Sequence, residues 1–311
     1  PRAHPGVGRC AGGDTLMSKH FEFTGETQRL NRVTLHRIRA TRNLDNIGVE
    51  KGDLGGWIEH ESNLDDSGWV FDQGKVHGHA RVFDNAIVAE NATVHGNARV
   101  SGLSQILGQT QVFGDAWVFD QAIVHGRAWL YGNTKLFGQA QVSGKAEISG
   151  NAVIQGKVVV GDNAVIGDSA ELHDRARVYG DAIVRGESQV SGRAVVAGNA
   201  ELTNYSIVSG TAEIFEPGHV MTFSSLGPNN IHITAFRTAD GGHVVKISEW
   251  TVNKTVESKV TDWEGSISDF LEEVHRRADN WEEATVEQRD QWLQEYTALS
   301  ALIGNRVSTW S

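Results

Sequence analysis

The sequence lacks most of the features that would place it in several common classes. Its 311 residues include a single cysteine, Cys10, which excludes an intramolecular disulfide framework and a cysteine-rich zinc site. It has only four prolines, and no apolar run approaches the roughly 18 residues that a membrane-spanning helix needs. No segment is strongly basic and the net charge is −11, so the composition argues against both membrane and nucleic-acid partners.

What the chain does contain is a long, regular spacing of aliphatic residues. At 26 consecutive positions six residues apart, from Val70 to Val220, the residue is Val, Ile or Leu. The residue two places before is almost always small, and Gly, Asp, Asn or Glu stands two places after. Residues two apart in a strand point to the same side, and Gly or Asp permits a tight left-handed turn. The spacing therefore predicts short strands and bends that coil the chain around an aliphatic interior.

The segments GNARV, GDAWV, GKAEI, GNAVI and GDAIV resemble the hexapeptide repeat of left-handed parallel β-helix proteins. This resemblance implies that three six-residue units make one triangular coil. The implied fold is mainly β, a left-handed parallel β-helix of about nine coils. The flanking segments FEFTGETQRLNRVTLHRIRATRNL and GDLGGWIE resemble those of uncharacterised phage and prophage hexapeptide proteins. That narrower resemblance implies a location in the cytoplasm of a bacterial host or in a virion.

The pattern divides the chain into four parts. Residues 1–16 differ from the rest and precede Met17, so we expect them to be a translated leader or another non-native extension. Residues 17–66 are predicted to form a strand-rich N-terminal cap, and residues 67–221 the β-helix. Residues 222–311 leave the six-residue spacing and are predicted to form a small ββαα domain.

Local signals predict the elements of the two end domains. The N-terminal hairpin is expected to turn near Asn31, and the C-terminal hairpin at Asp240–Gly242. The amphipathic segment GSISDFLEEVHRRA predicts a helix with a capping pair at Ser266 and Asp269. A second helix is expected to end near Gly304–Asn305. Its inward side chains are predicted to be Trp292, Leu293, Tyr296, Leu299 and Ile303.

Three histidines are the candidate catalytic and metal-binding residues. His77 and His95 are 18 residues apart and therefore stack on one face of a three-unit coil, with His79 beside them. Such a group could bind a metal ion or act as a general base near neutral pH. The alternative, which we favour, is that these histidines occupy outward positions of the sheet and have no chemical role.

The β-helix resemblance also implies an enzyme hypothesis. Many hexapeptide proteins are trimeric acyltransferases that use acetyl-CoA or an acyl carrier protein, with a histidine as general base. His77 or His95 would serve as that base here. Such enzymes form pockets with loops that leave the coil, whereas the spacing here has no insertion. We therefore expect no cofactor, with acetyl-CoA as the alternative, and leave the enzyme question open.

Aromatic residues at outward positions of the N-terminal half are the candidate interface. Exposed apolar side chains at this density mark protein contacts. A homotrimer seam or a partner site is therefore predicted at Phe83, Phe113, Trp117, Phe119, Trp129, Tyr131 and Phe137. The alternative is that the cap or the C-terminal hairpin folds back to cover these residues.

Taken together, these features favour a phage-type scaffold that presents flat faces to an unidentified protein partner. The acyltransferase is the second hypothesis, with its site between subunits. A third and weaker hypothesis is an acidic inhibitor or mimic of nucleic acid, because residues 262–295 contain 11 acidic and 3 basic residues.

Overall fold

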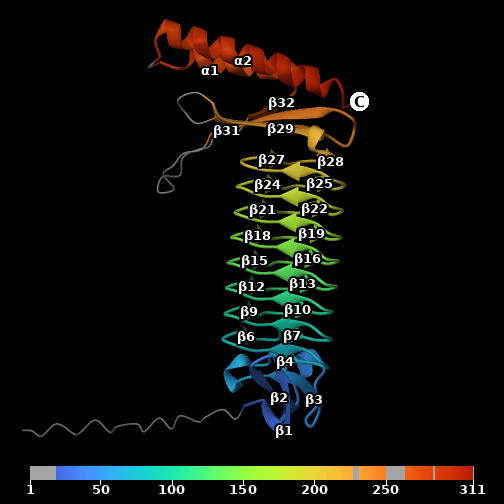
Figure 1. Cartoon of the computed structure of the whole chain (residues 1–311). Helices are drawn as coiled ribbons and strands as arrows, with labels where there is room; N and C mark the ends of the chain where they lie inside the picture. Colours follow the sequence, from blue (N-terminus) through green and yellow to red (C-terminus); the bar gives the residue numbers. More distant parts are fainter. Residues whose placement is uncertain (1–18, 227–230, 250–262, 283, 311) are drawn as a thin grey trace, which may run out of the picture.

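The structure is a computed structural model that describes residues 19–226, 231–249, 263–282 and 284–310. The predicted extension at residues 1–16 lies outside the described residues. Figure 1 shows a rod with an N-terminal strand cap at one end, a stack of coils, and a sheet with two helices at the other end. The predicted mainly β fold, with a parallel β-helix of about nine coils, is confirmed.

Each coil contains three short strands, and residues 18 apart pair in parallel from one coil to the next. Val112, for example, pairs with Val94 below it and Leu130 above it. The strands therefore form three faces. Face 1 comprises β3 (Leu54–Ile58), β5 (Lys75–Val76), β8 (Thr93–Val94), β11 (Gln111–Val112), β14 (Trp129–Leu130), β17 (Glu147–Ile148), β20 (Val165–Ile166), β23 (Ile183–Val184) and β26 (Glu201–Leu202).

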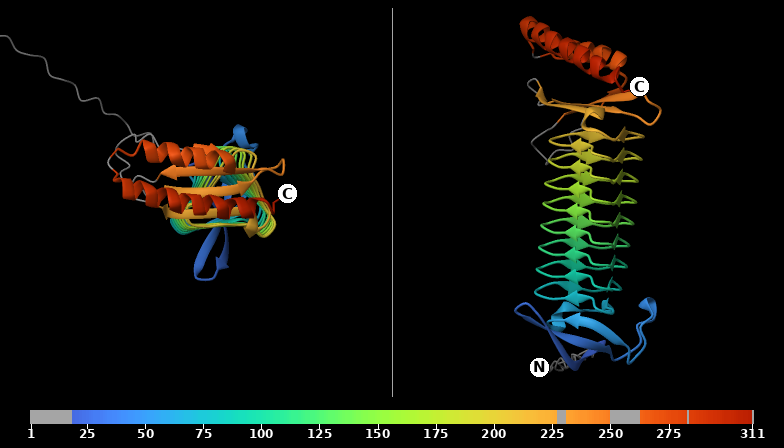
Figure 2. Two further views of the ribbon diagram at one scale, coloured as in Figure 1. Left: turned by 90° about the horizontal axis from the view of Figure 1, so that it is seen from above. Right: turned by 45° about the vertical axis from the view of Figure 1, so that its right-hand side comes forward.

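The other two faces have the same construction. Face 2 comprises β6 (Arg81–Val82), β9 (Arg99–Val100), β12 (Trp117–Val118), β15 (Lys135–Leu136), β18 (Val153–Ile154), β21 (Glu171–Leu172), β24 (Gln189–Val190) and β27 (Ile207–Val208). Face 3 comprises β4 (Trp69–Val70), β7 (Ile87–Val88), β10 (Gln105–Ile106), β13 (Ile123–Val124), β16 (Gln141–Val142), β19 (Val159–Val160), β22 (Arg177–Val178), β25 (Val195–Val196) and β28 (Glu213–Ile214). Viewed along the rod, the coils have a three-sided outline (Figure 2).

The corners depend on a left-handed backbone at one position in six. Every sixth residue from Asp66 to Gly210 has a positive φ, between 51° and 82°. Most of these residues are glycines, because a side chain is strained in this conformation and Asp or Asn tolerates it best. At five of the seven positions with an Asp, the carboxylate accepts a hydrogen bond from the next coil, as Asp162 does from the Gly180 N–H at 3.0 Å. Aspartate therefore both tolerates the turn and links successive coils.

The interior of the coil is one continuous aliphatic core. The periodic Val, Ile and Leu side chains from Val70 to Ile214 are at most 1% exposed. The small residues two places before them are buried as well, which leaves room for the larger side chains at the corners. Burying each aliphatic side chain contributes about 1.5–3 kcal/mol before conformational entropy is counted.

The N-terminal cap is a hairpin followed by a strand that joins the coil. It contains β1 (Phe21–Leu30), β2 (Val33–Ala40) and the 3₁₀ helices η1 (Asp45–Ile47) and η2 (Glu61–Asn63). Asn31 lies in the hairpin turn with a φ of 54°, as the sequence predicted. Strand β3 pairs antiparallel with β2 and parallel with β5, so the hairpin extends face 1.

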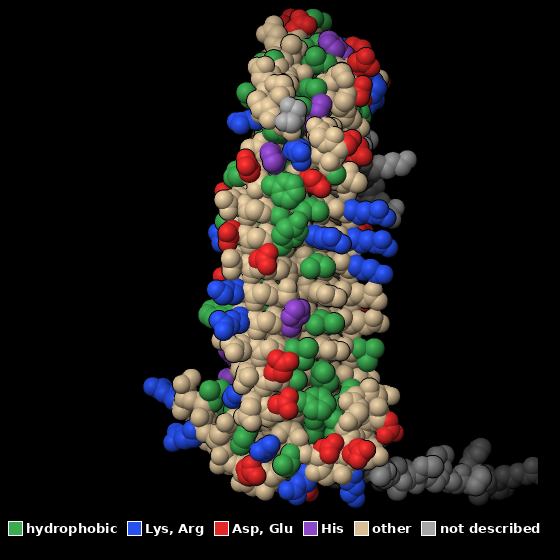
Figure 3. Space-filling model, turned by 90° about the vertical axis from the view of Figure 1, so that its right-hand side faces the viewer, with side chains coloured by type: hydrophobic (Ala, Val, Ile, Leu, Met, Phe, Trp, Pro, Cys, Tyr) green, Lys and Arg blue, Asp and Glu red, His purple; other side chains and the backbone are tan. Residues whose placement is uncertain are grey.

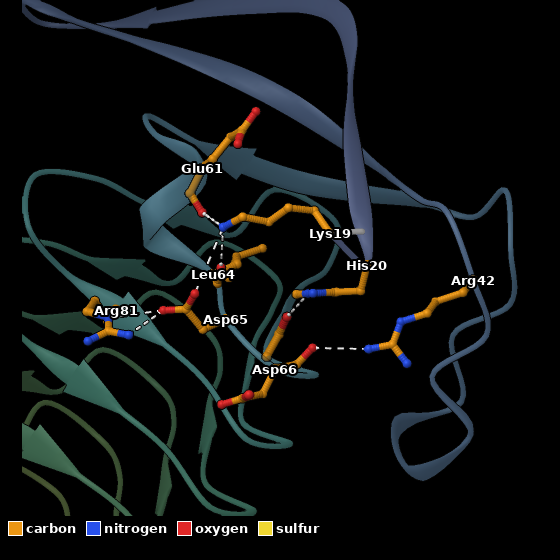
Figure 4. Close-up of polar contacts among 9 residues, drawn as sticks. Lys19, His20, Arg42, Glu61, Leu64, Asp65, Asp66 and Arg81 are labelled. Carbon is orange, nitrogen blue, oxygen red and sulfur yellow. Dashed lines mark hydrogen bonds and ion pairs between the residues drawn. The ribbon is translucent and has the colours of Figure 1, made fainter. Parts of the chain in front are cut away.

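Polar contacts fix the start of the cap on the first coil (Figure 4). The Lys19 ammonium lies 3.9 Å from the Asp65 carboxylate, which also pairs with Arg81 of β6. His20 Nε2 lies 2.9 Å from the carbonyl oxygen of Gly68, to which its N–H donates. Burial lowers the pKa of His20, and the hydrogen bond to Gly68, which favours the protonated ring, offsets only part of that shift.

A second unit closes the far end of the rod. It contains η3 (Pro217–His219), the strands β29 (Val220–Leu226), β30 (Ile231–Arg237), β31 (His243–Glu249) and β32 (Trp263–Gly265), and the helices α1 (Ile267–Asp279) and α2 (Val286–Val307). The sheet lies across the last coil, and the helices cover its other side (Figures 1 and 2). Phe236 packs into the coil core, whereas Ile233, Phe270 and Tyr296 belong to a separate core beneath the helices.

The strands of this unit differ from the expected ones in number. The predicted hairpin at Asp240–Gly242 is confirmed as β30 and β31, but β29 and β32 add two strands that the sequence analysis missed. Strand β29 begins at Val220, the last of the 26 periodic positions. That position therefore belongs to the antiparallel sheet, and the last coil strand ends at Ile214.

The two helices begin as expected, but the second ends later. The Ser266 hydroxyl accepts from the Asp269 N–H at 3.3 Å, which confirms the predicted cap of α1. Helix α2 runs to Val307, past the predicted end near Gly304–Asn305, because Ile303 and Val307 still pack on the second core. Of its predicted inward side chains, Trp292, Tyr296 and Ile303 are buried, and Leu293 and Leu299 are partly buried.

Candidate interaction surface

Face 1 carries a stack of four rings on its outer surface. His77, His95, Phe113 and Tyr131 follow the inward residue of β5, β8, β11 and β14, one in each coil. Successive ring centroids are 4.9, 4.9 and 5.0 Å apart, and the rings are within 7° of parallel. This spacing is that of neighbouring strands, so the coil itself sets the separation of the rings. The predicted stack of His77 and His95 is confirmed, and Phe113 and Tyr131 continue it.

The most exposed ring of face 1 lies beside the upper end of this column. Trp129 precedes Tyr131 across β14 and is 47% exposed, the highest value among the aromatic residues predicted as interface. The Tyr131 hydroxyl donates a hydrogen bond to the Glu147 carboxylate of the next coil. That bond raises the pKa of Tyr131 above its usual value, because it favours the protonated hydroxyl.

Face 2 carries a second, shorter group of rings. Phe119 stacks on Phe137 at 4.7 Å, and Trp117 lies 4.6 Å from Phe119 across β12. The Trp117 indole N–H donates to the Ser101 hydroxyl at 3.4 Å. Ser101 occupies the coil between Phe83 and Phe119, so Phe83 is separated from the other rings and instead lies under the Arg81 guanidinium. The structure thus brings together three of the four face 2 aromatics.

The two ring groups lie on either side of one corner. The face 1 rings and Trp117 are separated only by the turn around Gly114 and Gly132, which we call corner 1–2. All seven predicted residues except Trp129 are half-buried. Stacked rings cover one another, and the Arg81 guanidinium covers Phe83. Outward positions alone predict exposed aromatic residues, whereas the cover that neighbouring side chains give depends on the packed structure. We call the seven residues the aromatic surface.

Two of the three candidate histidines, His77 and His95, belong to the face 1 column. Burial lowers the pKa of both His77 and His95, so both are held in the neutral form. His79 lies on corner 1–2 and is exposed. Within the described parts of the chain, no group of three or more His, Cys, Asp or Glu side chains could hold a metal ion. Their catalytic and metal-binding roles stay predictions.

The lowered pKa values predict how acid affects stability. The folded-state pKa of His95 lies below the unfolded value of about 6.5, so folding favours the neutral ring. The stability that the folded protein gains from the neutral ring is fully present above pH 6.5, and it is lost as the pH falls through the folded-state pKa. We expect His95→Phe, which continues the ring column, to lose less stability than the wild type between pH 7.5 and 5.5 in urea denaturation. An equal loss in both proteins would contradict this.

One group of charged residues was not singled out from the sequence. Lys157, Arg175 and Arg193 are spaced by 18 residues and stand at the corner between faces 2 and 3. The 18-residue register predicts this column. Charge counts over continuous stretches of sequence do not reveal it, because the three cations are far apart in the chain.

Comparison with known proteins supports the repeat and no more. A family model described as the YdcK β-solenoid repeat matches residues 80–96 and 146–162. Each match covers one complete coil, β6–β8 in the first and β17–β19 in the second. The chain is therefore similar to a β-solenoid repeat protein, and the resemblance to phage hexapeptide proteins is not confirmed. No curated protein was found to match the chain. None of the described helices is long and apolar enough to cross a membrane.

Proposed function

We propose that this protein is a rigid scaffold that binds proteins through its flat outer faces, and that the aromatic surface joins three copies of the chain. The observation that carries the proposal is the pair of ring groups on either side of corner 1–2. Aromatic residues are enriched at protein interfaces, where they supply large contact area at low entropic cost.

The placement of the two groups fits a closed ring of subunits. A cyclic trimer needs two different patches on each subunit, because one patch contacts the other patch of the next copy. Face 1 supplies one patch, with Trp129 and Tyr131, and face 2 supplies the other, with Trp117 and Phe119. Corner 1–2 between them would then point towards the three-fold axis.

The uninterrupted coil favours surface binding over catalysis. From Asp66 to Ile214 the six-residue register has no insertion, so no loop leaves this part of the rod to build a pocket wall. Small-molecule sites need an enclosing cavity, whereas protein interfaces use flat faces. The flanking segments that resemble phage and prophage proteins support a role in a bacterial host cell or virion as part of the same proposal.

The oligomeric state tests the proposal directly. Light scattering should give the wild type about three times the chain mass of 33.9 kDa. Replacing Trp117 and Trp129 together by Glu should reduce it to the mass of one chain, because two charges would be buried in each seam. The matched control is Tyr179→Glu, an exposed aromatic on face 3, which should leave the trimer intact.

Two outcomes would contradict the proposal. A wild-type chain that stays monomeric at micromolar concentration has no trimer seam. A double variant that remains trimeric, with an unchanged melting temperature, places the seam somewhere other than the aromatic surface.

A further inference from the structure

The corner between faces 2 and 3 carries a row of cations in the C-terminal half of the coil. Lys157, Arg175 and Arg193 occupy the same position in three successive coils and line a shallow depression. All three are exposed, and strand spacing separates their backbones by about 4.8 Å per coil. Figure 3 shows Lys and Arg side chains in a row along one edge of the upper part of the rod.

These cations have no anionic partner in the described structure. None of the ion pairs or side-chain hydrogen bonds among the described residues involves Lys157, Arg175 or Arg193. Asp174 lines the same depression, and its carboxylate accepts from the Gly192 N–H at 2.9 Å. Three like charges this close repel one another, and this happens in a chain whose net charge is −11. An anion bound from solution would relieve this repulsion.

A fourth cation and a tyrosine continue the row onto face 3. Arg177 is exposed on β22, in the same coil as Arg175, and Tyr179 follows it. Tyr179 is 39% exposed, with Gly161 in the coil below and Ala197 in the coil above. Among the described residues it has no ring partner, in contrast to the stacked column on face 1. Its ring is therefore available to stack on a ligand.

We propose that this basic ridge, Lys157, Arg175, Arg177 and Arg193, binds the backbone phosphates of a single-stranded nucleic acid, with one base stacked on Tyr179. Arginine guanidinium groups match phosphate oxygens in a bidentate geometry. A positive strip beside an unstacked aromatic ring is the usual combination for single strands, whose bases are free to stack. The composition argued against nucleic acid because it summed charge along the chain, whereas the coil collects cations from residues 18 apart.

The shape of the ridge favours a polymer over a small phosphate compound. The depression is open and lies on a convex corner, so it encloses too little of a small ligand. A strand that lies along the rod axis can instead contact one cation in each coil. The ridge lies on a different corner from corner 1–2 and contains none of the seven residues of the aromatic surface, so this inference rests on different observations.

The test is fluorescence anisotropy of a labelled 12-nucleotide oligo(dT) with the full chain at several salt concentrations. Four phosphate contacts predict a slope of log affinity against log salt of about −2.8, or roughly 50-fold weaker binding at 200 mM than at 50 mM salt. Changing Lys157, Arg175 and Arg193 together to Gln should reduce the slope to about −0.7. Tyr179→Ala should weaken binding at least about fivefold without changing the slope.

The control is a variant with Arg127→Gln and Lys145→Gln, two exposed cations stacked on the corner between faces 3 and 1. It should bind like the wild type, and circular dichroism melts should show that every variant is folded. The proposal is overturned by an absence of binding at 50 mM salt, or by an equal loss in the control. It is also overturned if a duplex of the same length, or heparin, binds more tightly and Tyr179→Ala has no effect.

Discussion

Val142→Asp should unfold the rod around its substitution site, with a loss of at least about 4 kcal/mol in the free energy of unfolding. Val142 lies on β16 with its side chain fully buried, and it pairs with Val124 and Val160 in the adjacent coils. An aspartate there would place a carboxylate in an aliphatic interior without a hydrogen-bond donor. Burying an unpaired charge is among the most costly single changes in a protein.

Chemical denaturation followed by circular dichroism measures this loss. The matched control is Gln141→Asp, which places the same side chain one residue earlier, at an exposed outward position of β16. That variant should differ from the wild type by about 0.5 kcal/mol or less. Each coil contacts only its neighbours, so hydrogen exchange should show the greatest loss of protection in β13, β16 and β19. A Val142→Asp protein as stable as Gln141→Asp would mean that this side chain does not face the core.

The coil could be predicted because three types of residue recur together in each six-residue unit. The inward aliphatic, the small residue before it and the left-handed residue after it each have a different physical cause, yet all recur every six residues. The end of the coil could not be predicted in the same way. Val220 keeps the spacing but starts β29, because a single aliphatic residue fits an antiparallel strand equally well. Strand β32, three residues long, has no periodic signal of its own.

For the aromatic surface, too, part of the structure could be predicted from the sequence and part could not. The 18-residue register correctly predicted that His77 and His95 stack on one face, since it depends only on the coil. The same register places Ser101 between Phe83 and Phe119, so this interruption could have been predicted from the sequence. The mutual covering of stacked rings could not, because it depends on side-chain packing. Gly304 shows the same limit in α2, where contacts with the second core outweigh a local helix-ending signal.

Gly132→Ala should destabilise the coil more than the same change at another glycine with similar backbone. Gly132 has a φ of 76°, and an added Cβ would lie 2.6 Å from the carbonyl oxygen of Gly150 in the next coil. The left-handed conformation alone costs a non-glycine residue about 1–2 kcal/mol. The clash with rigid backbone adds an overpacking cost of about 1–3 kcal/mol. Gly210, with a φ of 65° and no atom within 4 Å of its added Cβ, would have only the first cost.

An aspartate at Gly132 should recover part of this loss. Asp168 occupies the same corner two coils above, and its carboxylate accepts from the Gly186 N–H at 3.0 Å. In Gly132→Asp, the new carboxylate can accept from the N–H of Gly150 in the same way, and aspartate tolerates positive φ better than alanine. Urea denaturation should therefore rank the variants, from least to most stable, as Gly132→Ala, Gly132→Asp and wild type, with Gly210→Ala above Gly132→Ala. If Gly132→Ala and Gly210→Ala lose the same stability, backbone strain alone explains the glycines, and the close approach of successive coils does not.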